Sequence, residues 1–143
     1  MNTLSSLLNF IGNKIVEYDE ELYKVIATDN LPSVQIASGT NWVNLGSFTI
    51  PKKGTYLLEV IAMYPSNGTG RRAVGISTSS GATPFAVAAQ DIRNAVNGAA
   101  TITRAWKMYE VEQDNETYYI VGYQNSGSSL SVTVRREFVR IGL

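Results

Sequence analysis

From Val34 onwards the sequence alternates between short apolar runs and segments rich in Gly, Ser, Asn and Pro. Residues of the second kind tolerate tight turns or positive φ, so each such segment predicts the end of one strand and the start of the next. The runs that this spacing predicts as strands cover residues 34–38, 42–50, 55–64, 71–78, 85–93, 100–111, 117–124 and 130–143. About eight antiparallel strands at this spacing predict a sandwich or a barrel.

Before Pro32 the apolar residues follow a helical spacing instead. They recur at alternating steps of four and three, the heptad pattern of a coiled coil; the members are Leu4, Leu8, Ile11, Ile15, Tyr18, Leu22 and Val25. Isoleucine at both core positions favours three or more helices over two. We therefore predict a helical coiled-coil stalk over residues 1–30 and a head domain over residues 34–143. The alternative is a single helix that packs this seam, with Leu7 and Phe10, on its own domain.

The run at residues 117–124 is apolar on both of its faces. Successive residues of a strand point to opposite sides, so Tyr118 and Ile120 share one face while Tyr119, Val121 and Tyr123 share the other. An antiparallel strand that is apolar on both sides needs a cover for its outer face. We expect Tyr119, Val121 and Tyr123 to contact a neighbouring subunit, together with the seam residues of the N-terminal helix.

Adjacent arginines occur twice, at Arg71–Arg72 and at Arg135–Arg136. Since adjacent residues in a strand lie on opposite faces, neither pair forms a basic patch, and one member of each must point inward or into an interface. An inward arginine needs an acceptor for its charge. The carboxylates that we expect in this role are Glu59, Asp91 and Glu137.

Composition excludes several classes of function. The chain has no Cys and no His, which removes disulfides, thiolate nucleophiles, the Ser-His-Asp triad and most zinc sites. Its 12 basic residues balance 12 acidic ones, so the charge pattern argues against a nucleic-acid partner. No apolar run approaches the roughly 20 residues that span a bilayer, and the first residues lack the basic region of a secretory signal. We expect a non-enzymatic protein with no cofactor, metal, membrane insertion or cleaved leader.

Two acidic clusters can be compared with known chemistry. Glu110 and Glu112 are two residues apart, but paired carboxylates of glycosidases stand roughly 5 to 10 Å apart across a cleft, which nothing in the sequence indicates. We expect a solvated strand end there. Asp114, Asn115 and Glu116 offer three oxygen ligands in one turn, yet their spacing differs from that of an EF-hand loop. We expect a turn rather than a calcium site.

Four segments carry a resemblance to a known family: residues 47–64, 67–76, 118–132 and 138–143. The most specific element combines Gly54-Thr55-Tyr56, which leads into a long apolar strand, with Tyr-Gln-Asn-Ser-Gly at residues 123–127. In this order and at this separation, the segments resemble the trimeric jelly-roll family of tumour necrosis factor and the complement globular heads, and most closely the heads at the tips of bacteriophage tail fibres and baseplates. The last run departs from the family because residues 131–143 lack the turn that members often have there.

The resemblance implies a fold, an assembly and a location. It implies a mainly β, antiparallel jelly-roll sandwich that forms a homotrimer around its inner sheets, with the N-terminal helices as a short stalk. It also implies a virion component of a tail or baseplate, made in the host cytoplasm, whose N-terminal segment contacts other virion proteins. The function to expect is attachment to a host-surface receptor, with a saccharide as the expected ligand.

Candidates for receptor binding are loop residues and aromatic rings on which a sugar can stack. They are Trp42, Tyr64, Asn67, Asp114 and Asn115, with Trp106, Tyr109 and Tyr118 as further rings. Tyr and Trp are equally common in cores and at subunit interfaces, so each ring has a structural alternative. Two other functions remain open: a purely structural trimeric cap of a tail or baseplate, and, with less support, a glycan depolymerase. Glycan-array binding separates receptor attachment from the structural cap.

Overall fold

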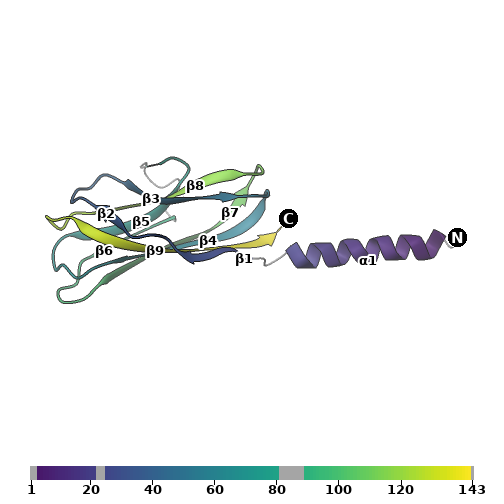
Figure 1. The fold of residues 1–143 in the computed structure, drawn as a ribbon, viewed down its shortest axis with the longest axis horizontal. Helices are drawn as coiled ribbons and strands as arrows, with labels where there is room; N and C mark the ends of the chain where they lie inside the picture. The colour runs from purple at the N-terminus through teal and green to yellow at the C-terminus, as the bar shows by residue number, and fades with distance from the viewer. Residues whose placement is uncertain (1–2, 22–24, 81–88, 143) are drawn as a thin grey trace.

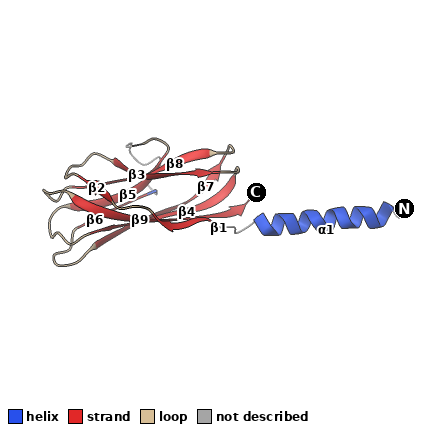
Figure 2. Cartoon of the chain, viewed as in Figure 1, coloured by secondary structure: helices blue, strands red, loops and turns tan. Residues whose placement is uncertain are grey.

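The computed structural model describes residues 3–21, 25–80 and 89–142 (Figure 1). Within these residues a helix, α1 (Thr3–Glu21), extends away from a β-sandwich (Figure 2). The strands are β1 (Val25–Asn30), β2 (Val34–Ile36), β3 (Val43–Ile50), β4 (Gly54–Tyr64), β5 (Arg71–Ser77), β6 (Gln90–Asn94), β7 (Thr101–Val111), β8 (Glu116–Gln124) and β9 (Leu130–Gly142). The predicted strand at 85–93 lies partly outside the described residues.

The strands form two layers. One sheet, here called sheet I, has the order β1-β9-β4-β7, with β2 also paired to β9; the other, sheet II, has the order β3-β8-β5-β6. All strand pairs within the two sheets are antiparallel. The prediction of an antiparallel sandwich is therefore confirmed.

The core lies between the sheets and follows the period-two alternation of their strands. In β4, for example, Tyr56, Leu58 and Val60 are fully buried. Phe48 of sheet II stacks on Phe138 of sheet I with ring centroids 3.7 Å apart, which joins the two layers. Burying each such side chain contributes about 2 kcal/mol or more to folding. Tyr118 and Ile120 belong to this core, as their shared face predicts.

The N-terminal boundary differs from the prediction. Helix α1 ends at Glu21, and residues 25–30 form β1, which pairs with the second half of β9. Two hydrogen bonds from the Arg136 guanidinium to the Asp29 carboxylate, of 2.7 and 3.1 Å, attach β1 to that strand. The heptad spacing includes Val25, but Val25, Ile26 and Thr28 are β-branched and favour a strand when a sheet edge is free to pair.

The missing turn in the C-terminal segment has a structural role. Strand β9 runs without a break over 13 residues. Its first part pairs with β2, its second part pairs with β1, and its other edge pairs with β4. One long strand therefore pairs with two short edge strands along the same edge. A turn within residues 131–143 would interrupt that edge.

Helix α1 exposes its apolar residues. Leu4, Leu7, Leu8, Phe10 and Ile11 are between 44% and 62% exposed, so the single chain does not pack this part of the helix on the sandwich. Of the other predicted seam residues, Ile15 and Tyr18 lie within α1, Val25 begins β1, and Leu22 lies outside the described residues. Among the described residues, no helix is both long enough and apolar enough to cross a bilayer.

Candidate functional site

Four loops meet at the end of the sandwich that lies away from α1 (Figure 1). They comprise residues 37–42, 65–70, 95–100 and 125–129, and we call this surface the distal end. Its loops consist of Ser, Thr, Asn, Gly, Ala, Val, Pro and Trp, with no charged side chain in any of them. The turns at the opposite end contain Lys52, Lys53, Glu112 and Asp114. The two ends of one sandwich thus differ in charge.

Side chains join the distal loops to one another. The Asn67 amide donates to the Ser128 hydroxyl at 3.2 Å, and the Thr69 hydroxyl lies 3.2 Å from the Ser126 carbonyl oxygen. Within its own loop, the Thr69 hydroxyl also lies 2.7 Å from the Asn67 side-chain oxygen. Hydrogen bonds between loops limit their conformational freedom before any ligand arrives, which reduces the entropy lost on binding.

Gln124 organises the same loops from below. Its fully buried amide nitrogen donates to the Ile36 carbonyl at 3.1 Å and to the Ser128 carbonyl at 2.7 Å, and its oxygen accepts from the Ser126 backbone nitrogen. The Ser38 hydroxyl accepts a hydrogen bond of 2.8 Å from the Gly127 backbone nitrogen. A buried amide that satisfies its donors and acceptor in this way adds rigidity rather than strain.

Arg72 lies beneath the distal end without any exposed surface. Its guanidinium donates to three backbone carbonyls, those of Asn67 at 2.9 Å and of Thr69 and Arg71 at 3.0 Å. Burial lowers the pKa of Arg72, because desolvation disfavours the charged form. Arg72 is the inward member of its pair, as predicted, but carbonyl oxygens replace the expected carboxylate. These bonds hold the backbone of residues 67–71 in place.

Glycine is required where two distal loops touch. Gly70 has φ +79°, a conformation that L side chains rarely adopt, and a Cβ there would collide with the backbone of Asn125. The Asn125 side chain accepts a hydrogen bond from the Arg71 backbone nitrogen, and the Asn125 backbone nitrogen donates to the Arg71 carbonyl at 3.2 Å. Residue 70 therefore permits the close contact that sets the spacing of these loops.

Among the predicted receptor-binding residues, Trp42 and Asn67 lie at the distal end. Trp42 is half-buried and packs edge-to-face with Tyr123, with ring centroids 5.0 Å apart. Tyr64 requires a correction, because it is fully buried and its hydroxyl donates to the Ala73 carbonyl. Burial raises the pKa of Tyr64. Tyr64 is part of the core that supports the distal end and has no surface to offer a receptor.

Asp114 and Asn115 lie at the opposite end of the sandwich. The Asp114 carboxylate accepts from the Lys53 backbone nitrogen at 2.9 Å and from the Lys52 amine at 3.3 Å, and these bonds lower the pKa of Asp114. Asn115 has φ 61°, which fits the turn between β7 and β8. The structure therefore does not bring these two residues together with Trp42 and Asn67. In the described residues, no three Asp or Glu side chains gather into a metal-binding group.

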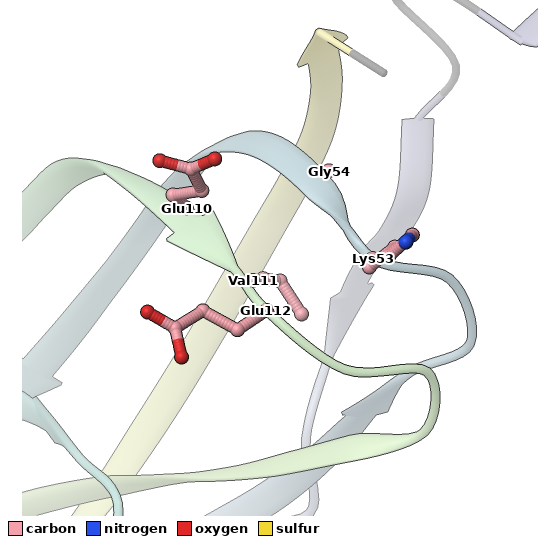
Figure 3. A pocket seen from close by; sticks show the side chains of 5 residues that line it. All are labelled: Lys53, Gly54, Glu110, Val111 and Glu112. Carbon is pink, nitrogen blue, oxygen red and sulfur yellow. The ribbon is translucent and has the colours of Figure 1, made fainter.

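A shallow hollow of about 330 Å³ lies beside the end of β7. Its lining consists of Lys53, Gly54, Glu110, Val111 and Glu112. Figure 3 shows that the carboxylates of Glu110 and Glu112 point apart rather than toward a shared point. A glycosidase needs two carboxylates that converge on one bond from opposite sides. This arrangement does not provide them.

The outer face of sheet I is exposed and apolar. In β7 the outward residues Ile102, Trp106 and Met108 are 53%, 58% and 59% exposed, while the small inward residues Thr103 and Ala105 are buried. Over residues 102–108 the polarity of the strand is thus reversed relative to that of an ordinary half-buried strand, whereas Tyr109 and Val111 face the core in the usual way. We call the exposed residues of β4 and β7 on this side the sheet I face: Met63, Ile102, Trp106 and Met108, with Glu59 and Arg104 among them.

Sequence reasoning missed the sheet I face, although the signal is present. Ile102, Trp106 and Met108 fall on one side of this strand, and the small residues Thr103 and Ala105 fall on the other. A strand with large apolar residues on one side and Thr and Ala on the other is normally oriented with the large residues inward. In the structure, Tyr56, Leu58 and Val60 of the neighbouring strand β4 fill the core, and the large residues of β7 lie on the outer side.

The predicted subunit contact of Tyr119, Val121 and Tyr123 falls on the outer face of sheet II, where the structure contradicts it for Val121. Val121 has no exposed surface in the single chain, and Tyr123 is 9% exposed and packs on Trp42. Tyr119 is half-buried. Val121 is absent from the core between the sheets, so it does lie on the outer face, but the chain covers it without a second subunit. Val121 cannot contribute exposed surface to a contact between subunits.

No family model matches this sequence, and no curated protein matches it at the level of sequence. Solved structures do match its fold. The Eiger tumour necrosis factor of S. frugiperda has a TM-score of 0.52 and 8% identity over 84% of this chain and 93% of its own. The globular domain of zebrafish complement 1qA has a TM-score of 0.46 and 12% identity over 67% and 69%. A pilus protein of Bacillus endospore appendages has a TM-score of 0.46 and 9% identity over 83% and 90%.

These comparisons define the class of fold. The two antiparallel sheets, the order of their strands and the match to Eiger make the chain a jelly-roll sandwich of the tumour necrosis factor type. At 8% identity the likeness shows the fold alone. Any function must therefore be argued from the surfaces of this chain.

Proposed function

We propose that this chain is a non-enzymatic attachment protein of a bacteriophage tail or baseplate, which binds a host-surface saccharide as a homotrimer. The observation that carries the proposal is the distal end, where four uncharged loops rich in hydroxyl and amide groups are joined by hydrogen bonds. Hydroxyl and amide groups match the hydroxyls of a sugar, and fixed loops lose little entropy on binding it.

Binding at this surface does not require a deep pocket. Trp42 supplies a half-buried ring at the margin of the loops, and Asn67 supplies an amide within them. Shallow sites of this kind bind weakly one at a time. Three copies on one particle convert weak single contacts into strong attachment, because the second and third contacts form at a high effective concentration.

The sheet I face supports the homotrimer. Large exposed apolar residues clustered on one face of a sheet mark a surface that a partner covers. Its charged residues already neutralise each other, since Arg104 lies 2.6 Å from Glu59, so the face can be buried without leaving an isolated charge. The distal end lies at one end of the sandwich rather than on this face, so association through sheet I leaves the loops free.

Helix α1 supports the same assembly from the other end. Leu4, Leu8 and Ile11 are exposed in the single chain, as coiled-coil positions must be before association. We propose that these residues, with Ile15, Tyr18 and Leu22, form the trimeric stalk and that the N-terminal part of α1 contacts another virion protein.

A second candidate function, a structural cap without a receptor, rests on the same two features. The sheet I face and the exposed seam of α1 serve assembly whether or not the distal end binds anything. The two functions differ in whether the distal end binds a receptor.

The test places the same bulky residue at the two ends of the sandwich. Thr40→Trp fills an exposed position of the distal end, and Gln113→Trp is the matched control at an exposed position of the opposite end. We expect the full-length protein to bind a glycan array and host cells, Thr40→Trp to lose most of this binding, and Gln113→Trp to keep it. An assembled protein that binds no glycan and no host cell supports the structural cap instead.

A further inference from the structure

Arg71 differs from the other surface arginines of the described residues. Arg93, Arg104, Arg135 and Arg136 each lie within 2.6–3.6 Å of a carboxylate of their own chain. Arg71 is exposed, and in the described part of the chain its side chain has no carboxylate partner. Its backbone is nevertheless fixed on both sides by Asn125. A free cation on a fixed backbone is available to an external anion.

The position of Arg71 places it on the same outer face of sheet II as the aromatic pair of Trp42 and Tyr123. It lies at the start of β5 on the outer face of sheet II, because Arg72 is the inward residue and side chains alternate. Ala73, the next residue on that face, is the cross-strand partner of Tyr123, which contacts Trp42. A cation and a half-buried indole therefore share one corner of the molecule.

The electrostatic surroundings of this corner are positive. Arg72 adds a second, fully buried charge directly behind Arg71, and carbonyl dipoles rather than a carboxylate hold it. The distal loops contain no acidic residue. The Asp91 carboxylate of β6 already lies 2.7 Å from the Arg93 guanidinium and 2.8 Å from the Arg104 backbone nitrogen.

We propose that the saccharide bound at the distal end is anionic, that Arg71 binds its carboxylate or phosphate group, and that a sugar ring packs on Trp42. This inference rests on the proposed function. A guanidinium presents two parallel N–H groups that match the two oxygens of either anion. The uncharged loops then supply hydrogen bonds to the neutral hydroxyls of the same sugar, so charge selects the ligand and the loops orient it.

The experiment uses the full-length protein and a glycan array in which each backbone is printed in three forms: neutral, with a uronate carboxylate, and with a 6-phosphate. We expect binding to one anionic form of a backbone and weaker binding to its neutral form. The anionic form that binds identifies the source of the charge. Since exposed charges are screened by salt, we expect this binding to weaken as ionic strength rises.

Two matched variants assign the effect to Arg71. Arg71→Gln removes one charge from the distal corner, and Lys52→Gln removes one exposed charge from the opposite end. We expect Arg71→Gln to lower the affinity for the anionic form about tenfold or more, to leave residual binding to the neutral form unchanged, and to keep the thermal unfolding midpoint. Arg71→Lys keeps the charge but removes the two parallel N–H groups of the guanidinium, so we expect it to retain the affinity only in part.

The outcomes separate this inference from the proposed function. Equal binding to neutral and anionic forms, or equal affinity of Arg71→Gln and the unmodified protein, overturns the anionic ligand while the attachment function stands. Binding to no glycan in any form overturns both.

Discussion

The outer faces of the two sheets are opposite in character, although both belong to one sandwich. On sheet II the central residues Ala73 and Val121 have no exposed surface, although Ile92 of the edge strand β6 is 42% exposed on the same face. On sheet I the chain leaves Trp106 and Met108 more than half exposed. Sheet II thus covers the middle of its outer face within one chain, whereas sheet I leaves large apolar side chains exposed there. Apolar residues on the outer side of a strand do not by themselves identify an interface; their exposure in the folded chain does.

The largest effect should follow from a charge on the covered face. Val121→Asp places a carboxylate at a position that water does not reach, without a cation to pair with it. This lowers the free energy of unfolding by several kcal/mol. We expect the head to lose its folded structure whether or not it assembles, as measured by circular dichroism and thermal unfolding. Ser47→Asp, at an exposed position of the same sheet, is the control. An unchanged unfolding midpoint for Val121→Asp contradicts the contrast between the faces.

A charge on the exposed face should have a different and smaller effect. Trp106→Asp leaves the core untouched, because Trp106 is 58% exposed in the single chain. We expect the variant to fold but to lose its association, so that light scattering returns a mass near 15.6 kDa instead of about three times that value. Ser47→Asp should keep the larger mass. If the Trp106→Asp variant still forms a trimer of unchanged stability, the contact lies elsewhere.

The smallest effect concerns the ion pair at the edge of sheet I. A hydrogen bond from Arg136 lowers the pKa of Asp29, so the stability that this pair contributes is present above the ordinary carboxyl pKa and is lost as the pH falls through the lowered one. Since the Asp29 side chain is 49% exposed, screening limits the contribution to about 1 kcal/mol or less.

Replacement of Asp29 by Asn tests this pair. We expect Asp29→Asn to be slightly less stable near neutral pH and to lose less stability than the unmodified protein between about pH 6 and about pH 3. Chemical denaturation at both pH values measures the difference. Glu112→Gln, at the opposite end of β7 from the distal loops, is the control. Parallel losses in both proteins would show that the pair does not stabilise the fold.

Much of the fold could be predicted from the sequence, because turn residues and period-two alternation act locally. The core placement of Tyr118 and Ile120 needed only their own strand. The strand at residues 25–30 could not be predicted in this way, since its β structure depends on an edge of β9 more than 100 residues away. The heptad spacing of apolar residues continues through Val25, so it predicts a helix where the structure has a strand.

The surfaces were harder to predict than the core. Whether Val121 or Trp106 is covered depends on what lies above each sheet, and strand alternation carries no information about that. The distal end depends on topology as well. Trp42 and Asn67 lie in the distal loops while Tyr64, the last residue of β4, is buried, although all three belong to or border segments of similar composition. The sequence shows that each loop is uncharged, but only the fold shows that the four loops form one surface.

The reversed polarity of β7 bears on how the chain finds its fold. A slip of one residue in its pairing with β4 would turn Ile102, Trp106 and Met108 toward the core and bring the smaller residues outward. The same slip would also expose Val111 and bury the charged Arg104 and Glu110, so apolar burial along β7 alone selects the native register only weakly. Specific bonds oppose the slip: the Arg104 backbone nitrogen donates to Asp91, and its guanidinium pairs with Glu59. The proposed trimer would cover Trp106 and Met108 only in the native register, so association would add to the bonds that select this register.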